Sequence, residues 1–79
     1  MKLLIRNLDR LTTEEELVSI FKDFGEIEYC TLVIDPKSGS SKGFGFIEMP
    51  NVSEAQGAVK NLNYTTIGRN KIRVKTTKN

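Results

Sequence analysis

The sequence contains no histidine and only one cysteine, Cys30. A single cysteine cannot form an intrachain disulfide, and without histidine it cannot complete the usual zinc cluster of cysteine and histidine ligands. Nor does any apolar run approach the roughly 18 residues that a membrane-spanning helix requires. These absences argue against metal, redox and membrane functions. We expect neither a metal nor a cofactor, and no membrane partner.

The chain is short, and its first residues carry no recognisable targeting segment. With 79 residues it has room for one small domain, so we expect a single domain over residues 1–79 and no second domain that extends a binding site. An isolated domain of a larger protein would look similar. The first apolar run, Leu3 to Ile5, is too short for the hydrophobic region of a signal peptide. The default expectation is therefore a cytosolic or organelle-interior location, and we take the cytoplasm. We also expect a monomer.

Charge is distributed unevenly along the chain. Residues 1–36 carry four basic and eight acidic side chains, a net charge of −4, whereas residues 37–79 carry eight basic and two acidic, a net charge of +6. The net charge of +2 for the whole chain hides this asymmetry. A basic second half hints at a polyanionic partner, although basic clusters are often only solvated surface.

Four runs with the residue types of β-strands are separated by two helical patterns. We expect the strands over residues 2–6, 28–34, 43–49 and 71–75. The helices fall after the first and third strands, and a loop with Gly68 leads into the last strand. The order β-α-β-β-α-β usually gives an α+β sandwich of ferredoxin-like topology, with a four-stranded antiparallel sheet and both helices on one face. The other face of the sheet stays uncovered.

Both helices have start signals in the sequence. Thr13 and Glu16 form a capping box, in which each side chain satisfies an unpaired backbone donor at a helix start. Gly25 stands where a left-handed cap would end this first helix. Ser53 and Gln56 predict a second capping box at the start of the other helix.

The third expected strand indicates what lines the uncovered face. Side chains alternate across a strand, so every second residue shares a face. One face of this strand carries Lys42, Phe44, Phe46 and Glu48. Turning these four inward would bury two charges and expose Ile47 and Met49, so the less costly arrangement leaves both phenylalanines in water. A small domain seldom exposes adjacent aromatic rings within a basic rim unless a ligand covers them.

The same alternation places basic residues of the first and last strands on that face. The outward residues of the first strand are Lys2, Leu4 and Arg6, because burying two cations would cost far more than exposing one leucine. The outward residues of the last strand are Lys71, Arg73 and Lys75.

Two motifs link the sequence to a known family. The longer ribonucleoprotein signature, K/R-G-F/Y-G/A-F-V-x-F/Y, is closely matched by residues 42–49, which read Lys-Gly-Phe-Gly-Phe-Ile-Glu-Met. The shorter signature is similar to residues 3–8, Leu-Leu-Ile-Arg-Asn-Leu. The segments Phe21-Lys22-Asp23-Phe24-Gly25 and Ile67-Gly68-Arg69 also resemble the family. The chain therefore resembles the RNA recognition motif family over nearly its whole length, including small stand-alone bacterial members. It departs from the family at Leu4, where the shorter signature has an aromatic residue, and at Met49, where the longer signature ends in one.

The resemblance implies that the uncovered face binds single-stranded RNA. Phe46 would stack beneath one base, Phe44 would pack against a neighbouring base or between riboses, and Lys42 would contact a phosphate. Because Leu4 cannot stack, we expect modest affinity and modest sequence selectivity, in a protein of post-transcriptional RNA handling. Tyr29 is either a lateral stacking surface or a rim tyrosine without that role. The candidate RNA-binding residues are Lys2, Leu4, Arg6, Asn7, Tyr29, Lys42, Phe44, Phe46, Glu48, Lys71, Arg73 and Lys75.

Two other readings stay open at this stage. Some members of the family bind proteins rather than RNA, and the absence of an aromatic residue at Leu4 favours that alternative. Against it, both phenylalanines of the longer motif are present within a basic rim. An enzyme is disfavoured, because the sequence has no histidine, no Cys-x-x-Cys and no paired inward carboxylates. Single-stranded DNA is a further ligand that the sequence does not separate from RNA.

Overall fold

The elements follow the predicted order, with one short hairpin added. The structure is a computed structural model that describes residues 1–77, so Lys78, counted above among the basic residues, lies outside the described residues. The elements are β1 (Lys2–Arg6), α1 (Glu14–Lys22), β2 (Tyr29–Ile34), β3 (Ser41–Glu48), α2 (Val52–Leu62), β4 (Thr66–Ile67), β5 (Asn70–Lys71) and β6 (Arg73–Thr77). β3 therefore begins at Ser41 rather than at residue 43.

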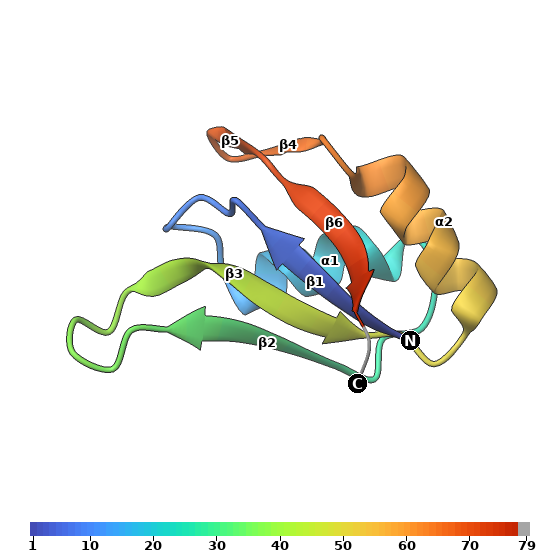
Figure 1. Cartoon of the computed structure of the whole chain (residues 1–79), viewed down its shortest axis with the longest axis horizontal. Coiled ribbons are helices and arrows are strands. Elements are labelled where there is room, and N and C mark those ends of the chain that lie inside the picture. The colour runs from blue at the N-terminus through green and yellow to red at the C-terminus, as the bar shows by residue number, and fades with distance from the viewer. Residues whose placement is uncertain (78–79) are drawn as a thin grey trace.

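Strands β2, β3, β1 and β6 form one four-stranded antiparallel sheet in that spatial order. Figure 1 shows α1 crossing behind this sheet and α2 running beside β6. This arrangement confirms the predicted ferredoxin-like sandwich, in which helices cover one face of the sheet. Within residues 1–77, neither helix is long and apolar enough to cross a membrane.

The core lies between the sheet and the helices. Leu3 and Ile5 of β1 and Ile47 of β3 have no exposed surface, and Phe21 of α1 packs among them in the same buried cluster. Met49, at the position where the family signature has an aromatic residue, is also buried in the core. The phenylalanines of β3, Phe44 and Phe46, are half-buried and stand outside this cluster. Their predicted orientation, away from the helices, is confirmed.

The start of α1 is confirmed, and its predicted end is wrong. The Thr13 hydroxyl oxygen accepts from the Glu16 amide at 3.1 Å, and the Glu16 carboxylate accepts from the Thr13 amide at 3.0 Å. The helix ends at a right-handed cap, Asp23, before Gly25 is reached. Gly25 has a φ of +152°, far from the left-handed helical value of about +57°. Glycine suits this position for two other reasons: other residues rarely adopt a φ of +152°, and a Cβ would collide with the Glu54 side chain, including its Cβ.

The predicted start of α2 is also wrong. The cap is Asn51, whose side-chain oxygen accepts from the Glu54 amide at 3.0 Å, and not Ser53 with Gln56. The helix thus begins two residues earlier than the sequence pattern suggested. The Glu54 carboxylate does not complete a capping box but accepts from the Glu26 amide at 3.1 Å, which ties the start of α2 to the segment before β2.

The segment before the last strand is a small hairpin rather than a plain loop. Thr66 and Ile67 of β4 pair with Lys71 and Asn70 of β5. Gly68, with a φ of +65°, supplies the left-handed turn between them. Lys71 therefore belongs to this second sheet, and β6 begins only at Arg73.

The two glycines of the longer signature serve the backbone of β3. A Cβ at Gly45 would lie 2.5 Å from the Thr31 carbonyl oxygen, so any other residue would push β2 and β3 apart. Gly43 has a φ of +84°, and its carbonyl oxygen accepts from the Leu8 amide at 2.8 Å. The two glycines therefore allow close backbone contacts next to Phe44 and Phe46 in the sequence, and these contacts fix the strand that carries both phenylalanines.

Candidate nucleic-acid interface

The side of the sheet away from the helices is organised in rows that run across the strands. Phe46 pairs with Thr31 of β2 and Leu4 of β1, and Leu4 pairs with Lys75 of β6. Directly opposed residues of antiparallel strands share a face, so these four form one row. We call the whole surface the open face; its residues are Lys2, Leu4, Arg6, Tyr29, Thr31, Phe44, Phe46, Glu48, Arg73 and Lys75.

The two phenylalanine rings stand edge to face at the centre of this surface. Their centroids are 6.3 Å apart and their planes are inclined by 85°. The Lys2 ammonium lies 4.6 Å from the centroid of the Phe46 ring, in cation–π geometry. The flexible Lys2 side chain thus lies over the flat face of the Phe46 ring. Leu4, opposite Phe46, adds an apolar surface that cannot stack as a ring would.

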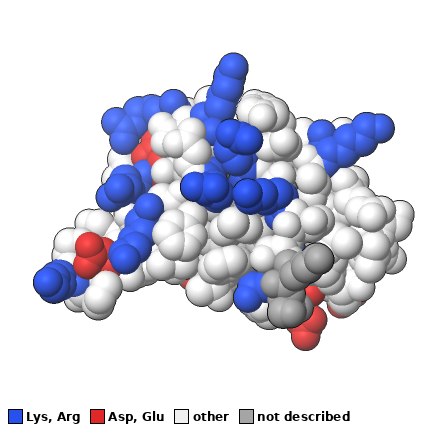
Figure 2. All heavy atoms as spheres, in the orientation of Figure 1, with Lys and Arg blue, Asp and Glu red and all other residues white. Residues whose placement is uncertain are grey.

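Cations gather on the half of the open face formed by β1 and β6. Arg6 and Arg73 are directly opposite each other across these strands, and Lys75 lies further along β6. Directly opposed like charges are unfavourable in a sheet. Figure 2 shows basic side chains grouped over this part of the surface, with few acidic ones near them. The arrangement favours a polyanion over this half of the sheet.

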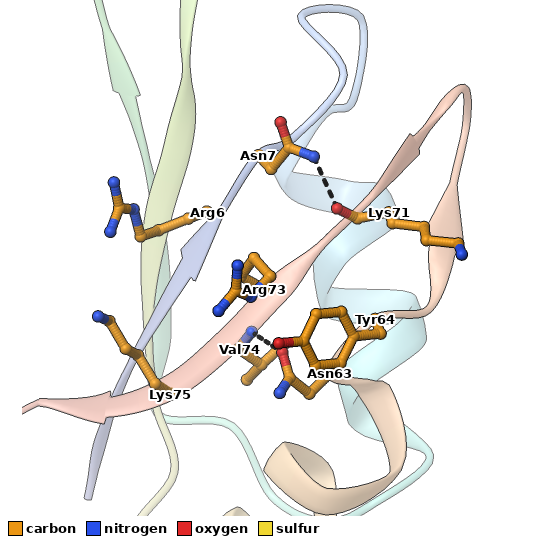
Figure 3. A pocket seen from close by; sticks show the side chains of 8 residues that line it. All are labelled: Arg6, Asn7, Asn63, Tyr64, Lys71, Arg73, Val74 and Lys75. Carbon is orange, nitrogen blue, oxygen red and sulfur yellow. Dashed lines mark hydrogen bonds between the residues drawn. The ribbon is translucent and has the colours of Figure 1, made fainter.

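A groove of about 560 Å³ borders the outer edge of β6 (Figure 3). We call it the β6 groove; its lining residues are Arg6, Asn7, Asn63, Tyr64, Lys71, Arg73, Val74 and Lys75. The Asn7 side-chain amide donates to the Lys71 carbonyl oxygen at 2.7 Å. The Lys71 side chain extends away from Arg6 and Lys75 (Figure 3). The prediction that Lys71 lies with them on the open face is therefore wrong.

Sequence reasoning missed Asn63 and Tyr64 in this groove. The Asn63 side-chain oxygen accepts from the Val74 amide at 2.9 Å, and the Arg73 guanidinium carbon lies 4.8 Å from the centroid of the Tyr64 ring. Both residues follow α2 directly, outside any strand, so strand alternation could not place them. One feature of the sequence could have pointed to this site: Tyr64 is an aromatic residue in the segment that leads into the basic strand β6.

A second, smaller hollow of about 380 Å³ brings Lys42 and Phe44 together with Arg6 and Asn7. The predicted grouping of Lys42 with the phenylalanine platform therefore holds at this end of β3. Arg10, which the sequence did not single out, also lines the hollow. It reaches the site from the loop after β1, beyond any strand pattern.

Tyr29 and Glu48 occupy the opposite end of the open face from these hollows. They pair across β2 and β3, and Tyr29 is 43% exposed. The Glu48 carboxylate accepts from the Met1 ammonium at 2.7 Å. Lys2 lies on the other side of Glu48, in register with it on β1. This corner is therefore less basic than the β6 side.

An ion pair fixes the loop after β1 against the β4–β5 hairpin. The Arg69 guanidinium donates to both oxygens of Asp9, at 2.9 and 3.1 Å, and the Leu11 amide donates to Asp9 at 3.0 Å. These hydrogen bonds, that of Arg69 above all, hold the pKa of the Asp9 carboxyl well below its usual range. The pair joins two segments that border the open face.

Cys30 lies on the helix side of β2, opposite Ile47. Burial raises the pKa of its thiol to about 11, and the negative charge of Glu14 adds to the shift. The thiol is therefore kept protonated at neutral pH, when it is a weak nucleophile.

Comparison with known proteins places this geometry in a family. The sequence model of the RNA recognition motif family matches residues 3–73. An uncharacterized RNA-binding protein of Schizosaccharomyces pombe is 40% identical over 70 residues, covering 89% of this chain and 17% of that protein. The human poly(U)-binding-splicing factor PUF60 is 39% identical over 62 residues, covering 78% of this chain and 11% of that protein. The chain thus spans less than a fifth of either relative.

A solved structure shows the same architecture with a ligand present. The structure of the RNA15 RRM with bound RNA (GU) superposes with a TM-score of 0.89 at 26% sequence identity. The match covers 99% of this chain and 83% of that one.

Proposed function

This chain belongs to the RNA recognition motif family, and from that premise we propose that it binds single-stranded RNA on the open face of its sheet. The observation that carries the proposal is the position of Phe44 and Phe46, outside the core and beside the cations of β1 and β6. The RNA-bound structure with the same fold and the RNA-binding names of the relatives support it.

Binding begins at the aromatic pair. A base stacks on Phe46 in the middle of its row, and Phe44 contacts the next base or the sugar between them. The base replaces the Lys2 ammonium over the ring, which frees that cation for a phosphate. Each stacked base contributes about 1 to 3 kcal/mol and tolerates any base identity, because every base has a π-face.

Backbone contacts supply the rest of the affinity. An RNA strand that runs from the phenylalanines toward β6 brings its phosphates to Arg6, Arg73 and Lys75. At the other end of the platform, Lys42 lies beside Phe44. With Leu4 in place of a third ring, we assign modest affinity and modest selectivity to this surface. Whether single-stranded DNA competes with RNA is decided by the 2′-hydroxyl groups.

The wider role we assign is post-transcriptional RNA handling by binding rather than by catalysis. Relatives of the chain include a splicing factor and an RNA-binding protein. A monomeric state and a cytoplasmic location stay predictions from the sequence.

The proposal is tested with the variant Phe46→Ala and a fluorescently labelled single-stranded RNA pool of random sequence. We expect Phe46→Ala to weaken binding by about tenfold, the loss of one stacked base, while the thermal midpoint stays close to that of the parent chain. Fluorescence anisotropy measures the first and circular dichroism the second. A DNA pool of the same length, run in parallel, measures the RNA preference.

Leu11→Ala is the matched control, because Leu11 is also apolar and is 77% exposed but lines a different surface, with Glu14 of α1 and Leu32 of β2. It should bind RNA as tightly as the parent chain. The proposal is wrong if Phe46→Ala binds RNA normally, or if it destabilises the fold by about 3 to 5 kcal/mol, as truncation of a core phenylalanine does.

A further inference from the structure

Tyr64 has the features of a stacking residue outside both ribonucleoprotein motifs. Tyr64 is 57% exposed, and the centroid of its ring lies 4.8 Å from the Arg73 guanidinium carbon. In Figure 3 the ring stands at the β6 groove, with Arg73 between it and Arg6. A flat cation on a tyrosine ring marks a face that a planar, electron-poor group can occupy.

The backbone at Tyr64 is unusual for a bulky residue. Among the described residues, Tyr64, with a φ of +69°, and Asn7, with a φ of +60°, are the two non-glycine residues with positive φ, and both line the β6 groove. Asparagine adopts this conformation readily, whereas tyrosine does so at a cost. The turn itself would favour glycine, so the ring has to be explained by something other than the turn. Such strained positions concentrate at binding sites.

The chemistry of the groove fits a nucleotide. Among its described lining residues are four cations and no acid, so its charge suits phosphate. A peptide strand would find this edge already paired at Ile72 and Val74. The Ile72 amide donates to the Thr65 carbonyl oxygen, the Ile72 carbonyl oxygen accepts from the Tyr64 amide, and the Val74 amide donates to Asn63. Two side-chain amides, one aromatic ring and several cations are the groups that recognise a base with its phosphate.

The groove is also continuous with the phenylalanine platform. The row from Phe46 passes through Leu4 to Lys75, which itself lines the β6 groove. Two strand spacings, about 10 Å in all, separate β3 from β6. A strand of several nucleotides can therefore span the platform and the groove together, whereas a dinucleotide on the platform does not reach Tyr64.

We infer that the β6 groove is an additional nucleotide subsite, in which Tyr64 stacks with a base and Arg6, Arg73 and Lys75 neutralise the adjoining phosphates. The inference rests on the proposed RNA binding and extends it beyond the edge of the sheet. Tyr64 supplies the third aromatic ring that is missing at Leu4. It does so beside β6, the strand next to β1 in the sheet.

The test uses binding of hexauridylate and diuridylate by the parent chain, Tyr64→Gly and Tyr64→Phe. Glycine removes the ring and suits the backbone, so Tyr64→Gly should keep its thermal midpoint and lose about 5-fold or more in hexauridylate affinity. Its affinity for diuridylate should not change. Tyr64→Phe keeps a ring and should bind both as the parent chain does.

Tyrosine fluorescence gives a direct readout, because the chain has two tyrosines and no tryptophan. In Tyr29→Phe, Tyr64 is the one remaining tyrosine. After correction for RNA absorption, hexauridylate should quench its emission and diuridylate should not. Inorganic polyphosphate, which has the charge but no bases, should leave the emission unchanged; quenching by polyphosphate would overturn base stacking at Tyr64.

The outcomes separate this inference from the proposed function. If Phe46→Ala weakens hexauridylate binding while Tyr64→Gly binds normally, the subsite is overturned and the proposed function stands. If Tyr64→Gly weakens binding and Phe46→Ala does not, the subsite stands and the phenylalanine platform is wrong. A fall in the thermal midpoint of Tyr64→Gly would give the ring a structural role and overturn the subsite.

Discussion

Cys30 shows how a single residue is made inert by its place in the sheet. The raised pKa of its thiol, about 11 against an ordinary value of 9.0, means that little thiolate is present near neutral pH. We expect iodoacetamide to alkylate the folded chain slowly at pH 8 and the urea-unfolded chain quickly, because only the thiolate reacts. Mass spectrometry follows the reaction across the pH range, with circular dichroism to verify folding.

The pH profile distinguishes a shifted pKa from simple lack of access. Restricted access lowers the rate at every pH, whereas a raised pKa moves the rise in rate toward pH 11. The sign for stability follows, because a thiol that ionises more easily when unfolded makes the folded state less stable as the pH rises from about 9 to about 11. Equal alkylation rates for folded and unfolded chains at pH 8 would contradict this account.

Single residues differ in how well the sequence predicts them. The outward position of Phe46 could be predicted, because its strand neighbours include charged residues that cannot be buried unpaired. The role of Lys71 could not, because the hairpin that removes it from the last strand depends on one left-handed turn at Gly68. Tyr64 follows no periodic pattern and is found only from its surroundings in the fold.

At the scale of the element, α2 illustrates a choice that the sequence leaves open. Asn51 with Glu54 and Ser53 with Gln56 both have the spacing of a cap and its partner. The pattern cannot choose between two overlapping candidates. Tertiary contacts do, because the Glu54 carboxylate binds the Glu26 amide and thereby fixes where the first turn lies.

The cap gives a prediction with a built-in control. Asn51→Ala should lower the free energy of unfolding by about 1 kcal/mol, because the Glu54 amide loses its acceptor. Ser53→Ala, within the first turn, should change it by less than about 0.5 kcal/mol. Urea unfolding with a common m-value measures both. A larger loss for Ser53→Ala than for Asn51→Ala would place the cap at Ser53 after all.

At the scale of the whole molecule, the charge difference between the two halves of the sequence becomes, on folding, a charge difference between the helix side and the open face of the sheet. The acidic first turn of α1, Glu14 to Glu16, lies on the helix side, whereas Arg6, from the same half of the sequence, joins the basic strand β6. The count by halves therefore predicted a polyanionic partner without predicting where it binds. Only the register of β1 against β6 assembles the basic surface, and the field of such a surface steers an anionic strand toward it.

This surface predicts how salt affects binding. For single strands, log K falls with log[salt] with a slope of about −0.7 per neutralised phosphate, so three or four contacts give about −2 to −3. Lys75→Gln on the open face should weaken hexauridylate binding and make the slope shallower by about 0.7, because one contact is lost. Lys22→Gln removes the same charge from the last turn of α1, behind the sheet, and should leave the slope unchanged. Titrations from about 50 to 300 mM KCl give both slopes. Because the two variants have the same net charge, equal slopes would mean that the whole-chain charge, and not the basic face, attracts the RNA.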